Sequence, residues 1–109
     1  MSKSPDSRRQ KLEAFVAANP ADAFARYGLA LECANSGDHE AALGHLRELV
    51  SRHPGYVAGY QQLGILLAKL ARMQDARRAF AAGIAAAQKA GNAHARDEMQ
   101  AALDSLGTG

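Results

Sequence analysis

The chain has 109 residues, a formal net charge of +2 and hydrophobic residues at 48% of its positions. This length suits one domain with a modest core. Its 13 cations and 11 anions are interspersed, so no long-range field selects nucleic acid or a membrane. Alanine occupies 25 positions, tryptophan is absent and no alternating β-branched run occurs, which together favour an all-α protein.

The first predicted helix begins at Ser7, because Ser7 and Gln10 form a capping box that satisfies backbone donors of the first turn. It ends near Ala18. Residues 1–6 before it are expected to be a disordered tail. Their polar sequence lacks the apolar run of a signal peptide, and no later stretch of about 18 uncharged apolar residues could span a bilayer. These features predict a cytoplasmic protein that does not insert into a membrane.

A pair of helices is expected to follow. The first of them has Asn19 as its cap and Pro20 at its first helical position, and it stops around Gly37. Asp38 can cap the second helix, which runs to about His53.

A second pair and a last helix complete the chain. The pair occupies residues 54–70 and residues 73–90, and Gly91 can end it in a left-handed conformation. Asn92 can cap the last helix, which spans roughly residues 93–106. Its apolar positions follow a single stripe, Met99, Ala102, Leu103 and Leu106.

Residues 34 positions apart match one after another along the chain. Pro20 repeats as Pro54, and Ala42 repeats as Ala76. The apolar columns are Leu12, Leu46 and Phe80; Phe15 and Leu49; Val16, Val50 and Ile84; Leu29 and Leu63; and Leu31 and Ile65. Columns that stay in phase in this way predict a repeated helix hairpin, and the opening helix matches the second half of such a hairpin.

The second hairpin contains the motif Tyr60-x-x-Leu63-Gly64-x-x-Leu67 followed by Ala76-x-x-x-Phe80. This motif resembles the tetratricopeptide repeat (TPR) pattern W-x-x-L-G-x-x-Y…A-x-x-x-F…P, with Tyr60 at the tryptophan position. The first hairpin matches less well, since Arg26 occupies the tryptophan position and Cys33 the tyrosine position. Gln88 replaces the final proline of the second hairpin, so that helix is expected to continue to about Gly91.

The resemblance covers about residues 8–90. It implies a right-handed superhelical stack of antiparallel hairpins with about six helices in a single domain over residues 7–106. The expected parts are a half-repeat at 7–19, repeat one at 20–53, repeat two at 54–91, a capping helix at 92–106 and a disordered tail at 107–109. It further implies a non-enzymatic adaptor that binds a peptide or helix of a partner protein in a concave groove.

The leading helix of each hairpin is apolar over most of its circumference, whereas the trailing helix has one apolar stripe and one charged face. In the family the leading helices line the groove. The corresponding residues here are Phe24, Tyr27, Leu31, Asn35, Gln61, Ile65 and Lys69. Co-chaperone TPR domains hold a terminal carboxylate with Lys, Asn and Arg in some of these columns. Tyr27, Leu31 and Ile65 cannot neutralise a carboxylate, so no clamp of that type is predicted.

Other interpretations of the apolar and basic surfaces remain open. The groove residues could be core that the capping helix or a second chain covers. That surface, or the opening helix with Leu12, Phe15 and Val16, could form a homodimer or dock onto a larger repeat protein. Nucleic-acid binding has only two basic clusters in its favour, Arg8-Arg9-Lys11 and Arg72 with Arg77-Arg78. No aromatic residue is interleaved with them, so solvated helix surface is the preferred interpretation.

No cofactor, metal or catalytic site is expected. The histidines at positions 39, 45, 53 and 94 do not share a helix face at the spacing zinc needs, and His45 is expected on a solvated face. Cys33, the only cysteine, has no cationic neighbour within two residues and no histidine partner in the sequence. It is expected to act as a small buried hydrophobe.

Overall fold

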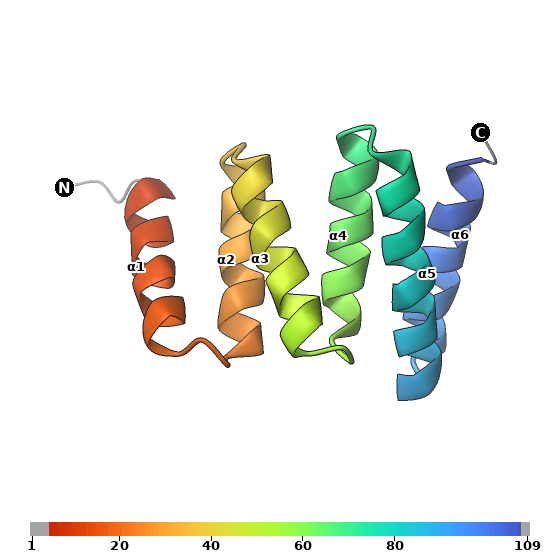
Figure 1. Cartoon of the computed structure of the whole chain (residues 1–109), viewed down its shortest axis with the longest axis horizontal. Helices are drawn as coiled ribbons and strands as arrows, with labels where there is room; N and C mark the ends of the chain where they lie inside the picture. The colour runs from red at the N-terminus through yellow and green to blue at the C-terminus, as the bar shows by residue number, and fades with distance from the viewer. Residues whose placement is uncertain (1–4, 108–109) are drawn as a thin grey trace. The chain divides into compact units, whose positions relative to one another are not determined.

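The computed structural model describes residues 5–107, and the side chains of residues 7–107. Within this range the chain forms six helices and no strand, which confirms the predicted all-α class (Figure 1). The helices are α1 (Pro5–Ala18), α2 (Ala23–Asn35), α3 (His39–Arg52), α4 (Val57–Lys69), α5 (Met73–Ala90) and α6 (Ala93–Ser105). The predicted tails comprise residues 1–6 and 107–109. Residues 1–4 and 108–109 lie outside the described residues, whereas residues 5–6 belong to α1.

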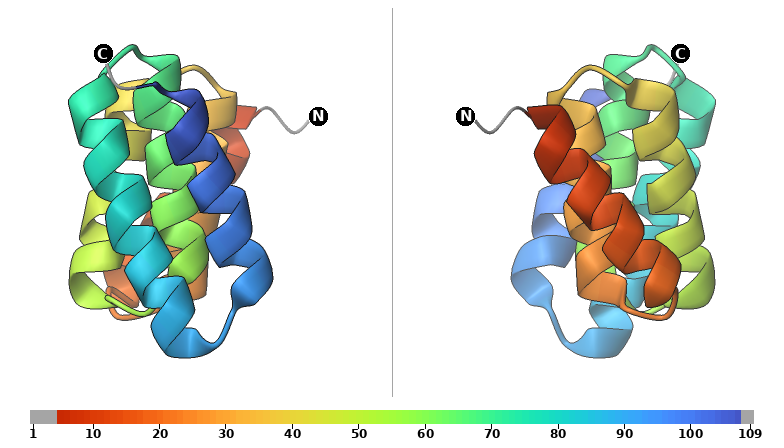
Figure 2. Two further views of the ribbon diagram at one scale, coloured as in Figure 1. Left: turned by 90° about the vertical axis from the view of Figure 1, so that its right-hand side faces the viewer. Right: turned by 90° about the vertical axis from the view of Figure 1, so that its left-hand side faces the viewer.

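The chain divides into two compact units, Met1–Arg52 and His53–Gly109, called unit 1 and unit 2 below. In unit 1, α2 packs against both α1 and α3. In unit 2, α5 packs against both α4 and α6, and Figure 2 shows α6 alongside α5. Each unit therefore has a central helix covered on two sides. The predicted repeat boundaries and superhelical stack stay predictions.

α1 begins at Pro5, two residues before the predicted start at Ser7. Proline is favoured at a first helical position, because its fixed φ suits the helix and its missing N–H would have no partner there. Ser7 consequently lies inside the first turn, and the prediction that it is the cap was wrong.

The prediction that α2 starts at Asn19 was also wrong. The backbone N–H and the side-chain amide of Asn19 both donate to the Phe15 carbonyl, at 2.8 and 3.0 Å, so this residue closes α1. The cap of α2 is Asp22, whose carboxylate accepts the Ala25 N–H at 2.9 Å. Because Asn19 is used by the preceding helix, the chain needs a further turn before the next one starts.

α4 likewise starts at Val57 and not at Pro54. Both prolines lie in the turn that precedes a leading helix, and each carbonyl accepts a hydrogen bond from a side chain six residues on. The Tyr60 hydroxyl donates to the Pro54 carbonyl at 2.8 Å, and the Arg26 guanidinium donates to the Pro20 carbonyl at 3.2 Å. The two residues at the tryptophan position of the motif thus make the same contact in their own units.

The ends of α2 and α4 also share one geometry. Gly37 and Ala71, which are 34 residues apart, both have left-handed backbones, with φ of 86° and 62°. The next residue donates its backbone N–H to a carbonyl of the helix at 2.9 Å in both cases. Asp38 donates to the Cys33 carbonyl, and Arg72 donates to the Leu67 carbonyl. This bond satisfies a carbonyl at the helix end. The sequence period is therefore a period of backbone structure as well.

The remaining predicted caps are confirmed. The Asp38 carboxylate accepts the Ala41 N–H at 3.2 Å at the start of α3. Gly91 ends α5 with φ of 71°, and the Asn92 side chain accepts the Ala95 N–H at 3.0 Å at the start of α6. α5 ends at Ala90, as the missing proline at position 88 predicted.

The core of unit 2 is built where large side chains meet glycines of neighbouring helices. Phe80 of α5 is 2% exposed, and a Cβ atom at Gly64 of α4 would lie 2.6 Å from its ring. Met99 of α6 is fully buried and lies against Gly83 of α5 in the same manner. The absence of a side chain at Gly64 and Gly83 lets these helices approach closely.

Candidate functional site

The predicted binding residues of unit 1 lie along α2, at spacings of three and four that place them on one face. Phe24 is 78% exposed, which is unusual for a large aromatic residue. Tyr27 and Leu31 are half-buried, and Asn35 is exposed at the end of the helix. These four residues are called the α2 stripe.

The predicted binding residues of unit 2 lie along α4 at spacings of four. Ile65 is 47% exposed, Gln61 is half-buried and Lys69 is exposed. These three residues are called the α4 stripe. Ile65 faces outward although its neighbours Gly64 and Leu66 are buried, so the helix presents an apolar side chain on its outer face. The structure brings each stripe together within its own unit, and the groove that combines them stays a prediction.

α1 differs from its predicted role as an exposed apolar face. Val16 is buried and Leu12 is half-buried, so only Phe15, at 48% exposure, presents a large apolar surface. In the alternative interpretation of α1 as a docking surface, Val16 is therefore not available to a second molecule. The physical reason is that α2 packs against α1 and covers the side that carries Val16.

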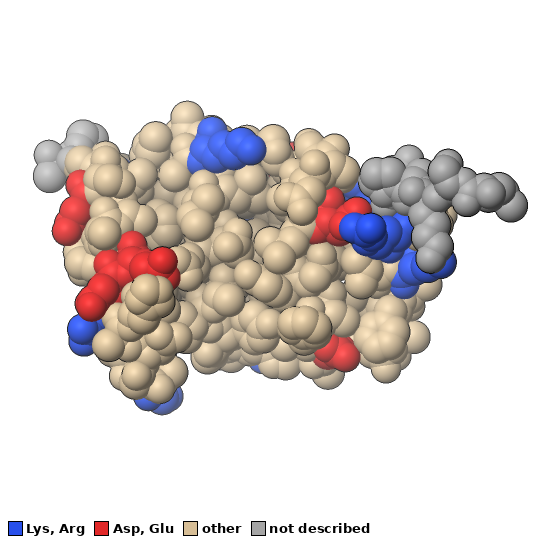
Figure 3. Space-filling view, turned by 180° about the vertical axis from the view of Figure 1, so that it is seen from behind, with Lys and Arg blue, Asp and Glu red and all other residues tan. Residues whose placement is uncertain are grey.

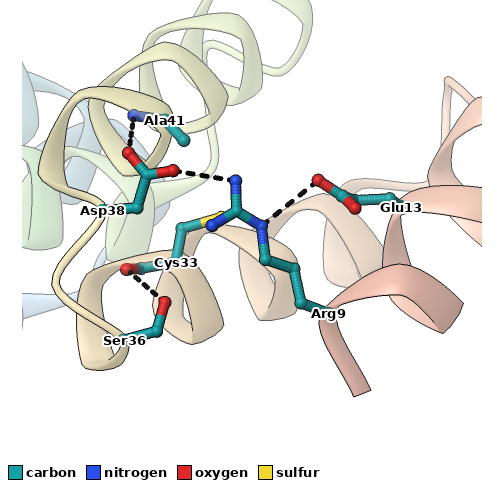
Figure 4. Close-up of polar contacts among 6 residues, drawn as sticks. All are labelled: Arg9, Glu13, Cys33, Ser36, Asp38 and Ala41. Carbon is teal, nitrogen blue, oxygen red and sulfur yellow. Dashed lines mark hydrogen bonds and ion pairs between the residues drawn. The ribbon is translucent and has the colours of Figure 1, made fainter. Parts of the chain in front are cut away.

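A polar cluster that the sequence did not reveal joins α1 to the turn between α2 and α3 (Figure 4). Arg9 lies between two carboxylates, at 2.9 Å from Asp38 and 3.2 Å from Glu13. The hydrogen bond from Arg9 holds the pKa of Asp38 below its usual range, and the Ala41 N–H lowers it further. The same two carboxylates raise the pKa of Arg9, and the contribution of Asp38 is larger than that of Glu13. The cluster ties α1 to the rest of unit 1.

We expect Asp38→Asn to remove the acid sensitivity that this cluster gives to unit 1. Asparagine keeps an oxygen for the Ala41 N–H but carries no charge for Arg9. Because the folded-state pKa lies below the unfolded value of about 4, the stabilisation is complete above about pH 4 and is lost as the pH falls through the folded-state pKa.

Melting temperatures at pH 7, 4 and 2.5 check this expectation. The melting temperature of the wild type should exceed that of the variant most at pH 7, and the two melting temperatures should be equal at pH 2.5. Asp22→Asn, at a cap for which the described residues show no arginine partner, is the matched control. A difference in melting temperature that is the same at all three pH values would contradict the role given to the ion pair between Arg9 and Asp38.

Arg26 is a buried charged residue of unit 1. Its side chain is only 9% exposed, and its Nε atom has no hydrogen-bond partner, although its guanidinium contacts the Pro20 carbonyl. His45 is half-buried, so the prediction that it lies on a solvated face was wrong. Burial lowers the pKa of His45, and the nearby positive charge of Arg26 adds to the effect. The burial of Arg26 could have been predicted, because Arg26 and Tyr60 share the tryptophan column of the motif.

Cys33 and the histidines belong to no metal-binding cluster in the part of the chain that the structure describes. Cys33 is fully buried, and burial raises the pKa of its thiol even though Arg9 opposes the shift. Within residues 5–107, no three metal-binding side chains converge on one point. Over the same residues, no helix combines the length and the apolar character needed to cross a bilayer.

α6 presents charged side chains outward and buries the opposite side. Ala95 and Met99 are buried, whereas Asp97, Glu98 and Asp104 are exposed. Figure 3 shows acidic side chains gathered over the end that α6 forms. Asp97 occupies the column in which Leu29 and Leu63 are buried. Asp97 is exposed, and the role of α6 as a capping helix stays a prediction.

Comparison with known proteins supports the geometry. A family model described as tetratricopeptide repeat matches residues 2–66. A TPR repeat-containing protein of Pseudomonas aeruginosa is 34% identical over 95 residues, which cover 87% of this chain and 90% of that protein.

Solved structures agree with this match. The solution structure of a tetratricopeptide repeat domain protein from Salinibacter ruber is 36% identical, with a TM-score of 0.77 over 81% of this chain and 89% of that one. A protein from Bordetella parapertussis is 30% identical, with a TM-score of 0.77 over 97% of this chain and 89% of that one. The chain belongs to the tetratricopeptide repeat family, whose domains are generally modules for protein–protein interaction and whose members are typically non-enzymatic scaffolds.

Proposed function

We propose that this chain is an adaptor that binds an amphipathic helix or an extended segment of a partner protein through the α2 stripe and the α4 stripe, the residues predicted from the sequence to line a concave groove. The observation that carries the proposal is the exposure of Phe24 and Ile65, at 78% and 47%. Large apolar side chains on the leading helix of each unit leave surface that a partner's apolar anchors can bury. Burying one such side chain contributes about 1.5–3 kcal/mol.

The polar members of the two stripes would orient the bound segment. Tyr27 and Gln61 occupy one column of the repeat, and Asn35 and Lys69 occupy another. Amide and hydroxyl groups at these positions can donate to backbone carbonyls of the partner. Lys69 is the single cation of the two stripes, so a free carboxyl terminus is not the expected anchor. The free-acid and amidated forms of a partner peptide should bind alike.

Ile65→Lys is expected to weaken partner binding by tenfold or more, because it places a charge where an apolar anchor would be buried. Phe24→Ala should act in the same direction. Both side chains are exposed, so the melting temperature should hardly change. Tyr27→Ala is a less clean test, since Tyr27 is half-buried.

The experiment compares the wild type, Ile65→Lys and the control Ala81→Lys in affinity capture from the source organism, and then in titrations with a peptide of the captured partner. Ala81 is exposed on α5, outside both stripes, so its variant should bind like the wild type. Equal binding by all three proteins would refute the groove.

Self-association through α1 is the alternative, and the exposure of Phe15 is the observation that supports it. A concentration-dependent dimer in sedimentation that Phe15→Asp abolishes would favour this alternative.

A further inference from the structure

Unit 2 contains an open pocket that lies outside both stripes. It is bounded by the turn before α4 and by the last turns of α5, and its volume is about 550 Å³. Clefts of about 300–1,000 Å³ are typical of sites that bind small ligands. Pro54 and Tyr60 form one wall, and alanines that include Ala82 and Ala86 form the other. Most of the lining is therefore apolar.

The equivalent positions of unit 1 carry long charged side chains. Ala82 and Ala86 correspond to Glu48 and Arg52, which lie 34 residues earlier. Those two residues form an ion pair at 2.5 Å, and the hydrogen bond from Arg52 lowers the pKa of Glu48. Tyr60 corresponds to the buried Arg26. The two units thus share a backbone pattern but differ in this surface, which is charged in unit 1 and apolar in unit 2.

The length of α5 adds a cation to the pocket. α3 ends at Arg52, whereas α5 continues to Ala90, past the position at which the TPR pattern has proline. The extra turn brings Lys89 to the pocket wall. Lys89 is exposed and has no ion-pair partner among residues 7–107. An apolar pocket with an unpaired ammonium group at its edge suits a ligand that combines an apolar group with a carboxylate.

We propose that this α5 pocket binds an aromatic or branched aliphatic side chain of a partner protein that has an Asp or Glu next to it. The apolar side chain lies against the Tyr60 ring and the alanines of α5, and the carboxylate pairs with Lys89. The hydrogen bond from the Tyr60 hydroxyl to the Pro54 carbonyl holds the ring in place before binding. The proposal goes beyond the groove, because every residue of the pocket belongs to unit 2 and none belongs to either stripe.

The probe for the test is the blocked dipeptide acetyl-Phe-Asp-amide, titrated into the ¹⁵N-labelled full chain and followed by amide chemical shifts. We expect shifts confined to residues 54–60 and 82–90. Acetyl-Phe-Asn-amide, which lacks the charge, should bind about two- to fivefold more weakly, the range typical of an exposed ion pair. Acetyl-Ala-Asp-amide, which lacks the apolar side chain, should cause no saturable shifts. Shifts centred on other residues, or equal affinity for the Asp and Asn forms, would overturn the proposal.

Variants of the chain separate the pocket from the groove. Ala86→Arg copies the residue of unit 1 into the pocket and should abolish the shifts, whereas Ala81→Arg, outside the pocket on the same helix, should not. Lys89→Gln changes an exposed residue and should remove the preference for Asp over Asn without loss of helicity. Ile65→Lys should leave dipeptide binding unchanged even if it abolishes partner binding in the groove. Dipeptide binding that survives Ala86→Arg would refute the pocket alone.

Discussion

Phe80→Ala should lower the free energy of unfolding by about 3–5 kcal/mol, the range for truncating a buried phenylalanine. The Phe80 ring is 2% exposed and lies against Gly64, which has no side chain to fill the space that the ring would leave. Small domains are stable by only about 5–15 kcal/mol in total. The variant is therefore expected to lose a large part of its stability, as urea unfolding followed by circular dichroism would measure.

Phe24→Ala is the matched control, because it removes the same side chain from another helix. Phe24 is 78% exposed, so the loss of unfolding free energy should stay within about 0.5 kcal/mol. Similar losses for the two variants would mean that Phe80 does not belong to the core of unit 2.

Gly83→Val should destabilise unit 2 by about 1–3 kcal/mol, the usual range for overpacking a core. A Cβ atom at this position would lie 2.5 Å from the Met99 Sδ and 2.7 Å from the Tyr60 Cβ. The thioether of Met99 is flexible and can move. The Cβ of Tyr60 is attached directly to the backbone of α4, so α4 and α5 would have to separate. Thermal melting would measure the effect.

Gly44→Val makes the same substitution on α3, where a Cβ atom would meet nothing within 4 Å. Valine has a slightly higher helix propensity than glycine, so this variant should be as stable as the wild type or a little more stable. A comparable loss of stability in both variants would show that the cost comes from the residue type and not from the contact between helices.

Much of the local structure could be predicted from residues alone. The end of α5 and the caps of α3 and α6 follow from single residues, Asp38, Gly91 and Asn92, because each satisfies backbone groups of its own helix. The all-α class follows from the alanine content and the columns 34 residues apart. Patterns of this kind act over three or four residues, or repeat one local arrangement, and they need no knowledge of distant contacts.

The starts of α2 and α4 could not be predicted in this way. Asn19 and Asp22 are both good caps, and the choice between them depends on the use of Asn19 at the end of α1. Pro54 likewise belongs to a turn whose carbonyl is bound by Tyr60. The start of α2 therefore depends on hydrogen bonds to α1, and the turn before α4 is held by a side chain of α4 itself.

The sequence by itself determined the number of helices, most of their ends and the column in which each residue of the repeat stands. Only the tertiary structure decided that Phe80 is buried and Phe24 exposed, and that alanines opposite Tyr60 leave a pocket in unit 2. The physical reason is that helix ends depend on hydrogen bonds between near neighbours. Exposure and open space depend instead on which side chains other helices bring to the same place.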